Sequence, residues 1–332
     1  MTKWQGLVLF AVAACDPLDP TVPGHLVRKT VVEDASLPAI SLNGSRFHAE
    51  AIGSPNLPTI VFLHGGPGAD YRSLLRMADP VDGARLSDRF QLVYWDQRGS
   101  GLSQRHGRAE LTLAQYRRDL LAIIDHYAPN RQVLLVGHSW GGMFATTFIN
   151  TYPSRVAGAV LIESGPLTAE TFTRLEGDLF DLNPGREWLN DYAWSTQFFS
   201  ADDHARMDFE LMLGNGVSQP RHHQRLSPDP EPTWRLGALA GTALLDDGRD
   251  RHGRYTFDFT SQLNTYRTPV LFIAGARSEI LGPSLQTQQL ALYPSASLHV
   301  VDGAGHDVPW THAAEVVRAM RPYLLARAGG IR

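Results

Sequence analysis

The apolar residues of this chain fall into short continuous runs separated by segments with helical periodicity. Runs rich in Val, Ile and Leu occupy residues 59–63, 91–95, 132–136, 159–162 and 269–274. Runs of this length and composition are typical of strands buried on both faces of a parallel sheet. Residues 113–127 instead repeat apolar side chains every three or four positions, which indicates an amphipathic helix. The alternation predicts an α/β domain with a mostly parallel sheet flanked by helices.

The same pattern suggests how the chain is divided. Two further strands are expected near residues 26–32 and 46–52, ahead of the alternation. The alternation stops between residues 167 and 265, where aromatic residues occur at helical spacings and Pro and Gly interrupt residues 183–185 and 227–232. We therefore expect a core in two parts, 26–166 and 266–328, and a mostly helical cap formed by residues 167–265.

Composition narrows the classes of function. The chain has 332 residues, 43% of them hydrophobic, with a net charge of −4 and no block of like charges. This length allows one large core with an insertion, and the charge gives no indication of nucleic-acid binding. Cys15 is the single cysteine, so an intrachain disulfide and a cysteine-based metal site are excluded. The pattern predicts neither a cofactor nor a metal, and it does not indicate an oligomeric state.

The segment 137–142, with the sequence GHSWGG, carries the clearest chemical signal. It lies between the apolar run 132–136 and the helix-forming segment 143–149. G-x-S-x-G between a strand and a helix is typical of a nucleophile elbow, in which small flanking residues permit a tight turn. The turn exposes the serine hydroxyl above a helix N-terminus, where backbone N–H groups favour negative charge. Ser139 is therefore the predicted nucleophile.

A serine nucleophile needs a base and an acid that orients the base. His306 lies on the Gly-rich loop 302–307, just past the expected strand 297–301, and is the predicted base. Glu279 is the first carboxylate after the expected strand 269–274, and we choose it as the acid on the chain order serine, acid, histidine. Glu163, at the end of the expected strand 159–162, is the alternative.

Two backbone N–H groups are expected to stabilise a tetrahedral oxyanion. One belongs to Trp140, the residue after the nucleophile. The other should come from the loop after the strand 59–63, where the sequence is HGGPG and glycines allow a substrate to approach the backbone. Gly66 is the predicted donor and Gly65 the alternative. His64 is interpreted as a residue that orders this loop.

Several motifs together resemble the prolyl aminopeptidase (proline iminopeptidase) branch of the α/β-hydrolase superfamily. They are HGGPG at 64–68, DQRGSGLS at 96–103, GxSWGG at 137–142 and the segments 279–283 and 303–306. The resemblance covers the catalytic core but not the cap. It implies the α/β-hydrolase fold and release of N-terminal residues, often proline, from peptides. His138 and Glu279 depart from the residues usual in the branch, and Asp96 resembles a structural loop anchor.

The sequence therefore predicts a cofactor-free serine hydrolase that acts through an acyl-enzyme, with peptides carrying a free N-terminus as the leading substrate class. A carboxylesterase or lactonase with the same triad is the alternative, and a catalytically silent binding protein would require a broken triad. For an aminopeptidase, one acidic side chain of the cap is expected to bind the substrate ammonium group, although charged residues on helix faces usually lie in solvent. The candidates are Glu170, Glu176, Glu187 and Glu210.

The first residues resemble a bacterial lipoprotein signal. A short basic start is followed by the apolar run 6–14 and then Cys15, preceded by small residues. The run is too short to span a bilayer as a mature helix. We expect residues 1–14 to be removed, Cys15 to be acylated and residues 15–25 to form a tether at the bacterial cell envelope. Cleavage without acylation, giving a soluble periplasmic enzyme, and a cytosolic protein with a later start are the alternatives.

Overall fold

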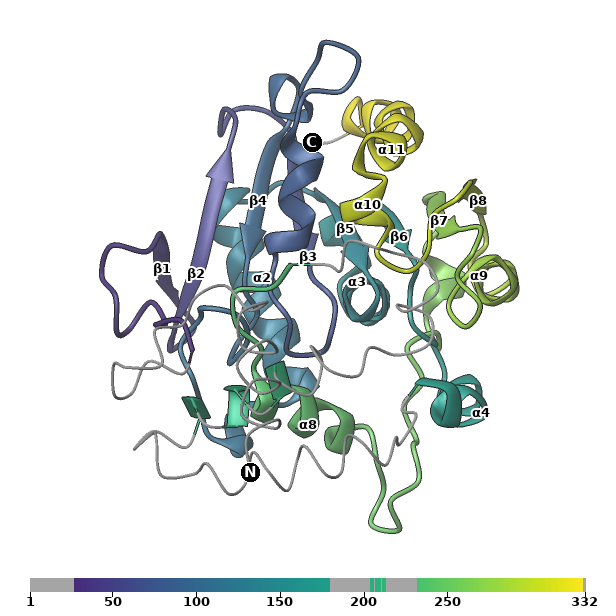
Figure 1. Ribbon diagram of the computed structural model, residues 1–332. Coiled ribbons are helices and arrows are strands. Elements are labelled where there is room, and N and C mark those ends of the chain that lie inside the picture. Colours follow the sequence, from purple (N-terminus) through teal and green to yellow (C-terminus); the bar gives the residue numbers. More distant parts are fainter. Residues whose placement is uncertain (1–26, 180–203, 206, 210, 213–231, 331–332) are drawn as a thin grey trace, which may run out of the picture.

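A computed structural model describes residues 27–179, 204–205, 207–209, 211–212 and 232–330, and within them an eight-stranded sheet forms the centre (Figure 1). The strand order is β1-β2-β4-β3-β5-β6-β7-β8. The strands are β1 (Ala39–Leu42), β2 (Ser45–Ile52), β3 (Thr59–Leu63), β4 (Gln91–Trp95), β5 (Val133–His138), β6 (Val156–Ile162), β7 (Val270–Gly275) and β8 (Ala296–Val301). Strands β3 to β8 run parallel, whereas β1 and β2 pair antiparallel. The expected α/β architecture is confirmed.

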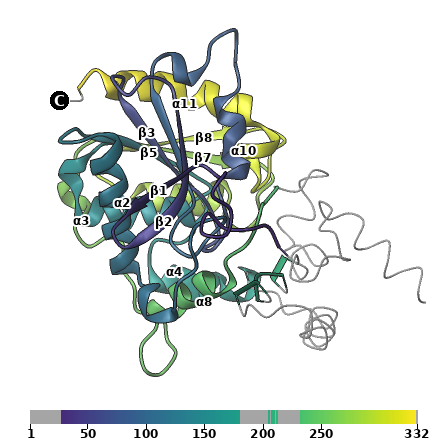
Figure 2. The same cartoon turned by 90° about the vertical axis from the view of Figure 1, so that its left-hand side faces the viewer.

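Helices cover both faces of the sheet. The α-helices are α2 (Leu113–Tyr127), α3 (Trp140–Thr151), α4 (Ala169–Leu179), α8 (Ala238–Asp247), α9 (Pro283–Leu290), α10 (Val308–Thr311) and α11 (Ala313–Ala328). Short 3-10 helices are η1 (Arg72–Ala78), η2 (Leu86–Asp88), η3 (Arg108–Glu110), η4 (Pro153–Arg155) and η6 (Leu263–Thr265). Figure 2 shows α2 and α3 on one side of the strands and α11 on the other.

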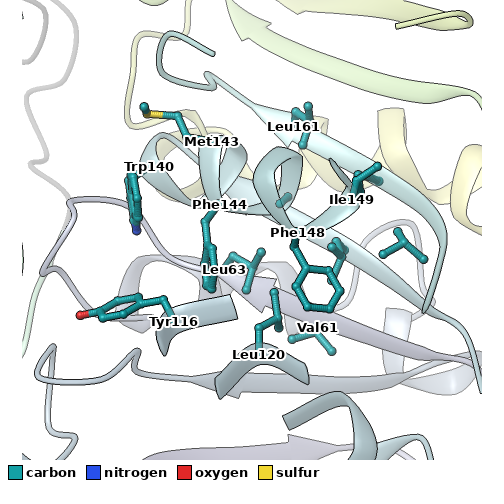
Figure 3. Close-up of a cluster of buried hydrophobic side chains, with 14 of the residues drawn as sticks. Val61, Leu63, Tyr116, Leu120, Trp140, Met143, Phe144, Phe148, Ile149 and Leu161 are labelled. Carbon is teal, nitrogen blue, oxygen red and sulfur yellow. The ribbon is translucent and has the colours of Figure 1, made fainter. Parts of the chain in front are cut away.

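Alternation along the central strands divides the core into two clusters. In β3, Val61 and Leu63 pack on the side of α2 and α3, while Ile60 and Phe62 pack on the side of η1 and α11. Figure 3 shows Val61 and Leu63 beneath Phe144 and Phe148 of α3. Because both faces are covered, every residue of β3, β4 and β5 is buried, which explains their continuous apolar runs.

The prediction of a strand at 26–32 is wrong for the described residues 27–32, which form a bend and irregular backbone that lead into a turn at 31–33. Val31 donates its N–H to the carbonyl of Leu102, at 2.8 Å, so this segment packs on the loop after β4. Within the described residues the first strand is β1, which is joined to β2 by the two residues Asn43 and Gly44, with φ angles of 47° and 72°. An Asn-Gly pair with positive φ at both positions is typical of a tight hairpin turn, a signal that the sequence analysis overlooked.

The described part of the expected cap lies over loops at the carboxyl ends of β3 and β4. Gly237, just before α8, donates its N–H to the carbonyl of Gly68 at 2.7 Å. A Cβ atom at Gly237 would lie 2.1 Å from the carbonyl oxygen of Gly99, so only glycine permits this close approach. Figure 1 shows α4 and α8 at the lower edge of the molecule, away from α11. The domain boundaries at 167 and 265 stay predictions, and residues 1–25 lie outside the described part.

Candidate active site

Ser139 lies in the predicted elbow between β5 and α3. Its φ and ψ angles are 54° and −117°, a backbone region that non-glycine residues rarely occupy. A Cβ atom at Gly137 would lie 2.2 Å from the carbonyl oxygen of Gly141, and one at Gly141 would lie 2.0 Å from that of Leu63. The glycines are therefore required by direct backbone contact on either side of the serine, as the motif predicts.

Glu163 and His306 meet beside this elbow. The Nδ1 atom of His306 lies 3.3 Å from Oε2 of Glu163, and both side chains are buried. Glu163 follows β6, the strand adjacent to β5, and its φ angle of 47° marks a second strained backbone position. His306 is tied to the elbow through His138, whose Nε2–H donates to the His306 carbonyl at 2.9 Å. The rings of these two histidines have centroids 4.8 Å apart.

The structure places a buried carboxylate beside the predicted base. The carboxylate beside His306 Nδ1 belongs to Glu163, the alternative in the sequence analysis, and the side chain of Glu279 is exposed. The position after β7 that faces Glu163 is occupied by Ser278, whose hydroxyl donates to Glu163 Oε2 at 2.5 Å. The first carboxylate after β7, Glu279, therefore lies one residue beyond the buried position, which Ser278 occupies.

The environment of Glu163 opposes its ionisation. Burial raises the pKa of Glu163 to about 8, although donation from the Ser278 hydroxyl and from the N–H of Gly275, at 2.7 Å, lowers it. The nearby carboxyl group of Asp307 adds to the rise. A carboxyl group held this far from its usual range, and paired with a histidine, is typical of a catalytic site. Glu163 accepts hydrogen bonds from two neutral donors as well as facing the imidazole.

The predicted oxyanion loop lies against the nucleophile. A Cβ atom at Gly65 would be 3.3 Å from the Cβ of Ser139, so the backbone of the 64–68 loop runs directly beside the serine. Trp140 is the first residue of α3, which places its N–H at the helix N-terminus. Gly66, with a φ angle of 115°, is the next loop residue and is exposed. The choice between Gly66 and Gly65 as second donor stays a prediction.

His64 orders this loop, as expected. Its Nε2 accepts from the N–H of Gln97 at 3.0 Å, so Nδ1 carries the proton that it donates to the carbonyl of Gly65 at 2.9 Å. Burial lowers the pKa of His64, which favours this neutral form. The side-chain amide oxygen of Gln97 in turn accepts from the indole Nε1–H of Trp140 at 3.0 Å. His64 and Gln97 thus connect the oxyanion loop to Trp140, the residue after the nucleophile.

Asp96 acts as a structural loop anchor, as the resemblance implied. Its carboxylate accepts from the backbone N–H groups of Leu102 and Tyr71, at 2.8 and 3.0 Å, and its Oδ2 atom lies 2.8 Å from His48 Nδ1. Asp96 is fully buried, and a Cβ atom at Gly101 would lie 2.2 Å from its carboxyl carbon. These contacts close the loop after β4 around one carboxylate.

Two residues of this site were not identified from the sequence. The sequence marks His138 only as a departure from the residue usual in the branch, yet its ring donates a hydrogen bond to the backbone carbonyl of His306. Ser278 carried no signal of its own, because a serine in a loop is common and only its contact with Glu163 distinguishes it.

Of the predicted cap glutamates and Cys15, the structure describes the side chain of Glu170 alone. Glu170 is described and is exposed in the first turn of α4. The side chain of Glu176, together with Glu187, Glu210 and Cys15, lies outside the described part. Among the described residues, no group of three or more His, Cys, Asp or Glu side chains is arranged to hold a metal ion. In the same part of the chain, no helix has the length and apolar character needed to cross a membrane.

Comparisons with known proteins agree with this geometry. Residues 58–313 match the family model described as the alpha/beta hydrolase fold. The chain is 23% identical over 290 residues to proline iminopeptidase PfmaB of Pestalotiopsis fici, covering 86% of this chain and 98% of the relative. It is 28% identical over 282 residues to a pimeloyl-[acyl-carrier protein] methyl ester esterase of Stenotrophomonas maltophilia, covering 81% and 93%.

Among solved structures, a proline iminopeptidase of Mycobacterium smegmatis superposes with a TM-score of 0.61 at 17% identity, covering 88% of this chain and 98% of that one. This likeness shows the fold. The matched residues 58–313 include the elbow serine, the buried carboxylate after β6 and the histidine after β8. Because the match spans most of the chain and includes each of these residues, the chain belongs to the alpha/beta hydrolase fold family and is a hydrolase.

Proposed function

We propose that this protein is a serine hydrolase in which Ser139, His306 and Glu163 form the catalytic triad. His306 accepts the proton of the Ser139 hydroxyl as the oxygen attacks a substrate carbonyl, and later returns a proton to the leaving group. Glu163 holds the imidazole tautomer and stabilises the imidazolium. The observation that carries the proposal is the pairing of His306 Nδ1 with the buried carboxylate of Glu163, beside a strained serine elbow.

The tetrahedral oxyanion is proposed to bind the N–H groups of Trp140 and Gly66. The contact of Gly65 with Ser139 supports this placement, since it puts the 64–68 loop beside the nucleophile. A preorganised donor of this kind contributes roughly 3–4 kcal/mol to lowering the barrier in serine hydrolases. Collapse of the intermediate expels the leaving group and forms an acyl-enzyme, which water then hydrolyses through the same base.

The proposed substrates are peptides with a free N-terminus, from which the enzyme releases the first residue, with proline preferred. Support comes from the motifs HGGPG, DQRGSG and GxSWGG and from the similarity to proline iminopeptidase PfmaB over most of both chains. Such a substrate carries an ammonium group that requires a carboxylate partner once it leaves water. The cap offers four candidates for this carboxylate: Glu170, Glu176, Glu187 and Glu210.

A carboxylesterase or lactonase activity is the second candidate. The similarity to the esterase of Stenotrophomonas maltophilia covers 81% of this chain. Its sequence identity to this chain, 28%, is slightly higher than the 23% of the iminopeptidase. The triad serves either substrate class, because acyl transfer from an ester and from an amide uses the same groups. The cap and its charge would then decide the substrate.

The deciding experiment compares one proline arylamide with its N-acetylated form and with a neutral p-nitrophenyl ester of similar size. For an aminopeptidase, we expect kcat/KM for the acetylated amide to fall at least 100-fold, because the cap carboxylate is left unpaired. Equal cleavage of the two amides, or turnover of the ester alone, would establish the second candidate. Ser139→Ala is the control, and it should abolish turnover and labelling by a fluorophosphonate probe while the fold persists.

We also propose that the protein is anchored at the bacterial cell envelope through acylated Cys15. The support is the order of basic start, apolar run and small residues before this cysteine. Mass spectrometry of the membrane fraction should find a mature N-terminus at acylated Cys15, and Cys15→Ser should block that processing. A cytosolic protein that retains Met1 would refute the anchor, and cleavage without acylation would establish the soluble periplasmic alternative.

A further inference from the structure

Ser278 is buried in the loop after β7 and contacts the acid of the proposed triad. Its hydroxyl donates to Oε2 of Glu163 at 2.5 Å, and the same oxygen lies 3.3 Å from Nδ1 of His306. The loop holds Ser278 closely, since its N–H donates to the carbonyl of Gly275 at 3.1 Å. A Cβ atom at Gly282 would lie 1.9 Å from the Ser278 carbonyl oxygen. The hydroxyl is therefore fixed where it meets the carboxylate.

The negative charge of the Glu163 carboxylate is stabilised by neutral hydrogen-bond donors. Ser278 on the β7 loop and the N–H of Gly275 at the end of β7 donate to it. The titratable groups that face it are His306 and Asp307, both on the loop after β8, and Asp307 repels its charge. In a buried site a hydrogen bond to an ionised oxygen is stronger than one between neutral groups. The hydrogen bond from the Ser278 hydroxyl is thus a principal interaction that favours a charged and correctly oriented Glu163.

We propose that Ser278 is a positioning residue, which holds the Glu163 carboxylate in the orientation that accepts from His306. The proposal rests on the proposed function, since it assigns Ser278 a role in the Ser139–His306–Glu163 triad. Ser278 does not touch a substrate in this role. It acts through the acid, so its loss should slow acylation of Ser139 without altering substrate binding.

The placement of Ser278 has a second consequence. Strands β6 and β7 are parallel neighbours, with Ile162 opposite Ile273, so side chains just beyond their carboxyl ends converge on the same imidazole. An aspartate at position 278 would carry its carboxyl carbon where the serine hydroxyl now lies. If the side chain of Glu163 is shortened to alanine, the position beside His306 Nδ1 is vacated and the carboxylate of that aspartate would occupy it. The acid of this triad should therefore be movable from β6 to β7.

The first test measures the rate at which a fluorophosphonate probe labels Ser139 between pH 5 and 10, in wild type, Ser278→Ala and Ser278→Thr. We expect Ser278→Ala to label roughly tenfold more slowly at pH 7, and its half-maximal rate to move upward by about one pH unit. The direction follows because loss of a donor to the charged form raises the pKa of Glu163. Ser278→Thr keeps the hydroxyl and should retain most of the rate.

The second test compares Glu163→Ala with the double variant Glu163→Ala/Ser278→Asp. We expect the double variant to be labelled at least tenfold faster than the single variant. A purely structural role for Ser278 would not predict this recovery. Thermal melting shows that each variant is folded, and if Ser278→Ala does not fold, the double variant decides. A folded double variant without recovery would then overturn the proposal.

The outcomes separate this inference from the proposed function. If wild type labels at Ser139 but folded Ser278→Ala labels equally at every pH, the positioning role is refuted and the triad stands. If folded Ser278→Thr is as slow as folded Ser278→Ala, packing rather than the hydroxyl is responsible, and the inference is also refuted. A wild-type protein that fails to label at Ser139 would refute the proposed function, and the inference with it.

Discussion

Replacing Glu163 by glutamine should reduce activity and increase stability at alkaline pH. The substitution keeps the shape of the side chain but removes the charge beside His306 Nδ1. Glu279→Gln is the matched control, because it makes the same chemical change at an exposed residue of the neighbouring loop. The comparison also decides between Glu163, the acid proposed from the structure, and Glu279, the acid predicted from the sequence.

The expected loss of activity is about 10²- to 10⁴-fold in kcat for Glu163→Gln, since loss of the acid's charge in a serine triad destabilises the imidazolium and the required tautomer. KM should change little, because Glu163 is completely buried behind the histidine. Glu279→Gln should retain kcat within about twofold, as expected for an exposed residue outside the triad.

The gain in stability follows from the pKa of Glu163, which burial raises from 4.5 to about 8. Below about pH 4.5 the carboxyl group is neutral in both the folded and unfolded states. As the pH rises toward 8 it ionises only in the unfolded state, so folding stability is lost across this window. Glutamine does not titrate, and its advantage should grow to at most roughly 5 kcal/mol. Pairing with a protonated His306 would offset part of this gain.

Thermal melting at each pH unit from 5 to 9, beside activity on the same preparations, measures both effects. For a chain of this size we expect the difference in Tm between Glu163→Gln and wild type to grow by several degrees across this range, and to reach at most about 10 °C. Glu279→Gln should show no such trend. If Glu279→Gln is the inactive variant, or if the Tm difference is independent of pH, the assignment and electrostatics of Glu163 are wrong.

Three further substitutions test the frame around the triad. His138→Phe removes the hydrogen bond to the His306 carbonyl but keeps an aromatic ring. The folded variant should be labelled by a fluorophosphonate about tenfold more slowly than wild type. An unchanged rate would contradict a role for His138 in placing His306. Asp96→Ala leaves the buried N–H groups of Leu102 and Tyr71 without their acceptor. It should lower the free energy of unfolding, measured in urea, by about 3–5 kcal/mol. A loss below about 1 kcal/mol would refute the anchor role. Gly141→Ala places a methyl group against the Leu63 carbonyl and should prevent soluble expression or abolish labelling, whereas a folded, active variant would disprove the tight elbow.

The sequence by itself determined the features that depend on local pattern. The elbow was readable because its glycines are required by contacts within a few residues and with the adjacent strand, so the motif is constant wherever the turn occurs. Strands β3 and β4 were located at their observed bounds, since a fully buried strand needs a continuous apolar run. The helix at 113–127 was likewise identified from its amphipathic period.

Only the tertiary structure decided which carboxylate faces His306. Glu163 and Glu279 both follow buried strands in the required chain order, and neither local sequence reveals whether the side chain points into the site or into solvent. The outcome depends on how β6, β7 and the loop after β8 lie in space, because a distance of 3.3 Å between residues 143 positions apart is set by packing. The roles of Ser278 and His138 were hidden for the same reason: a hydrogen bond between distant segments leaves no periodicity or motif in the chain.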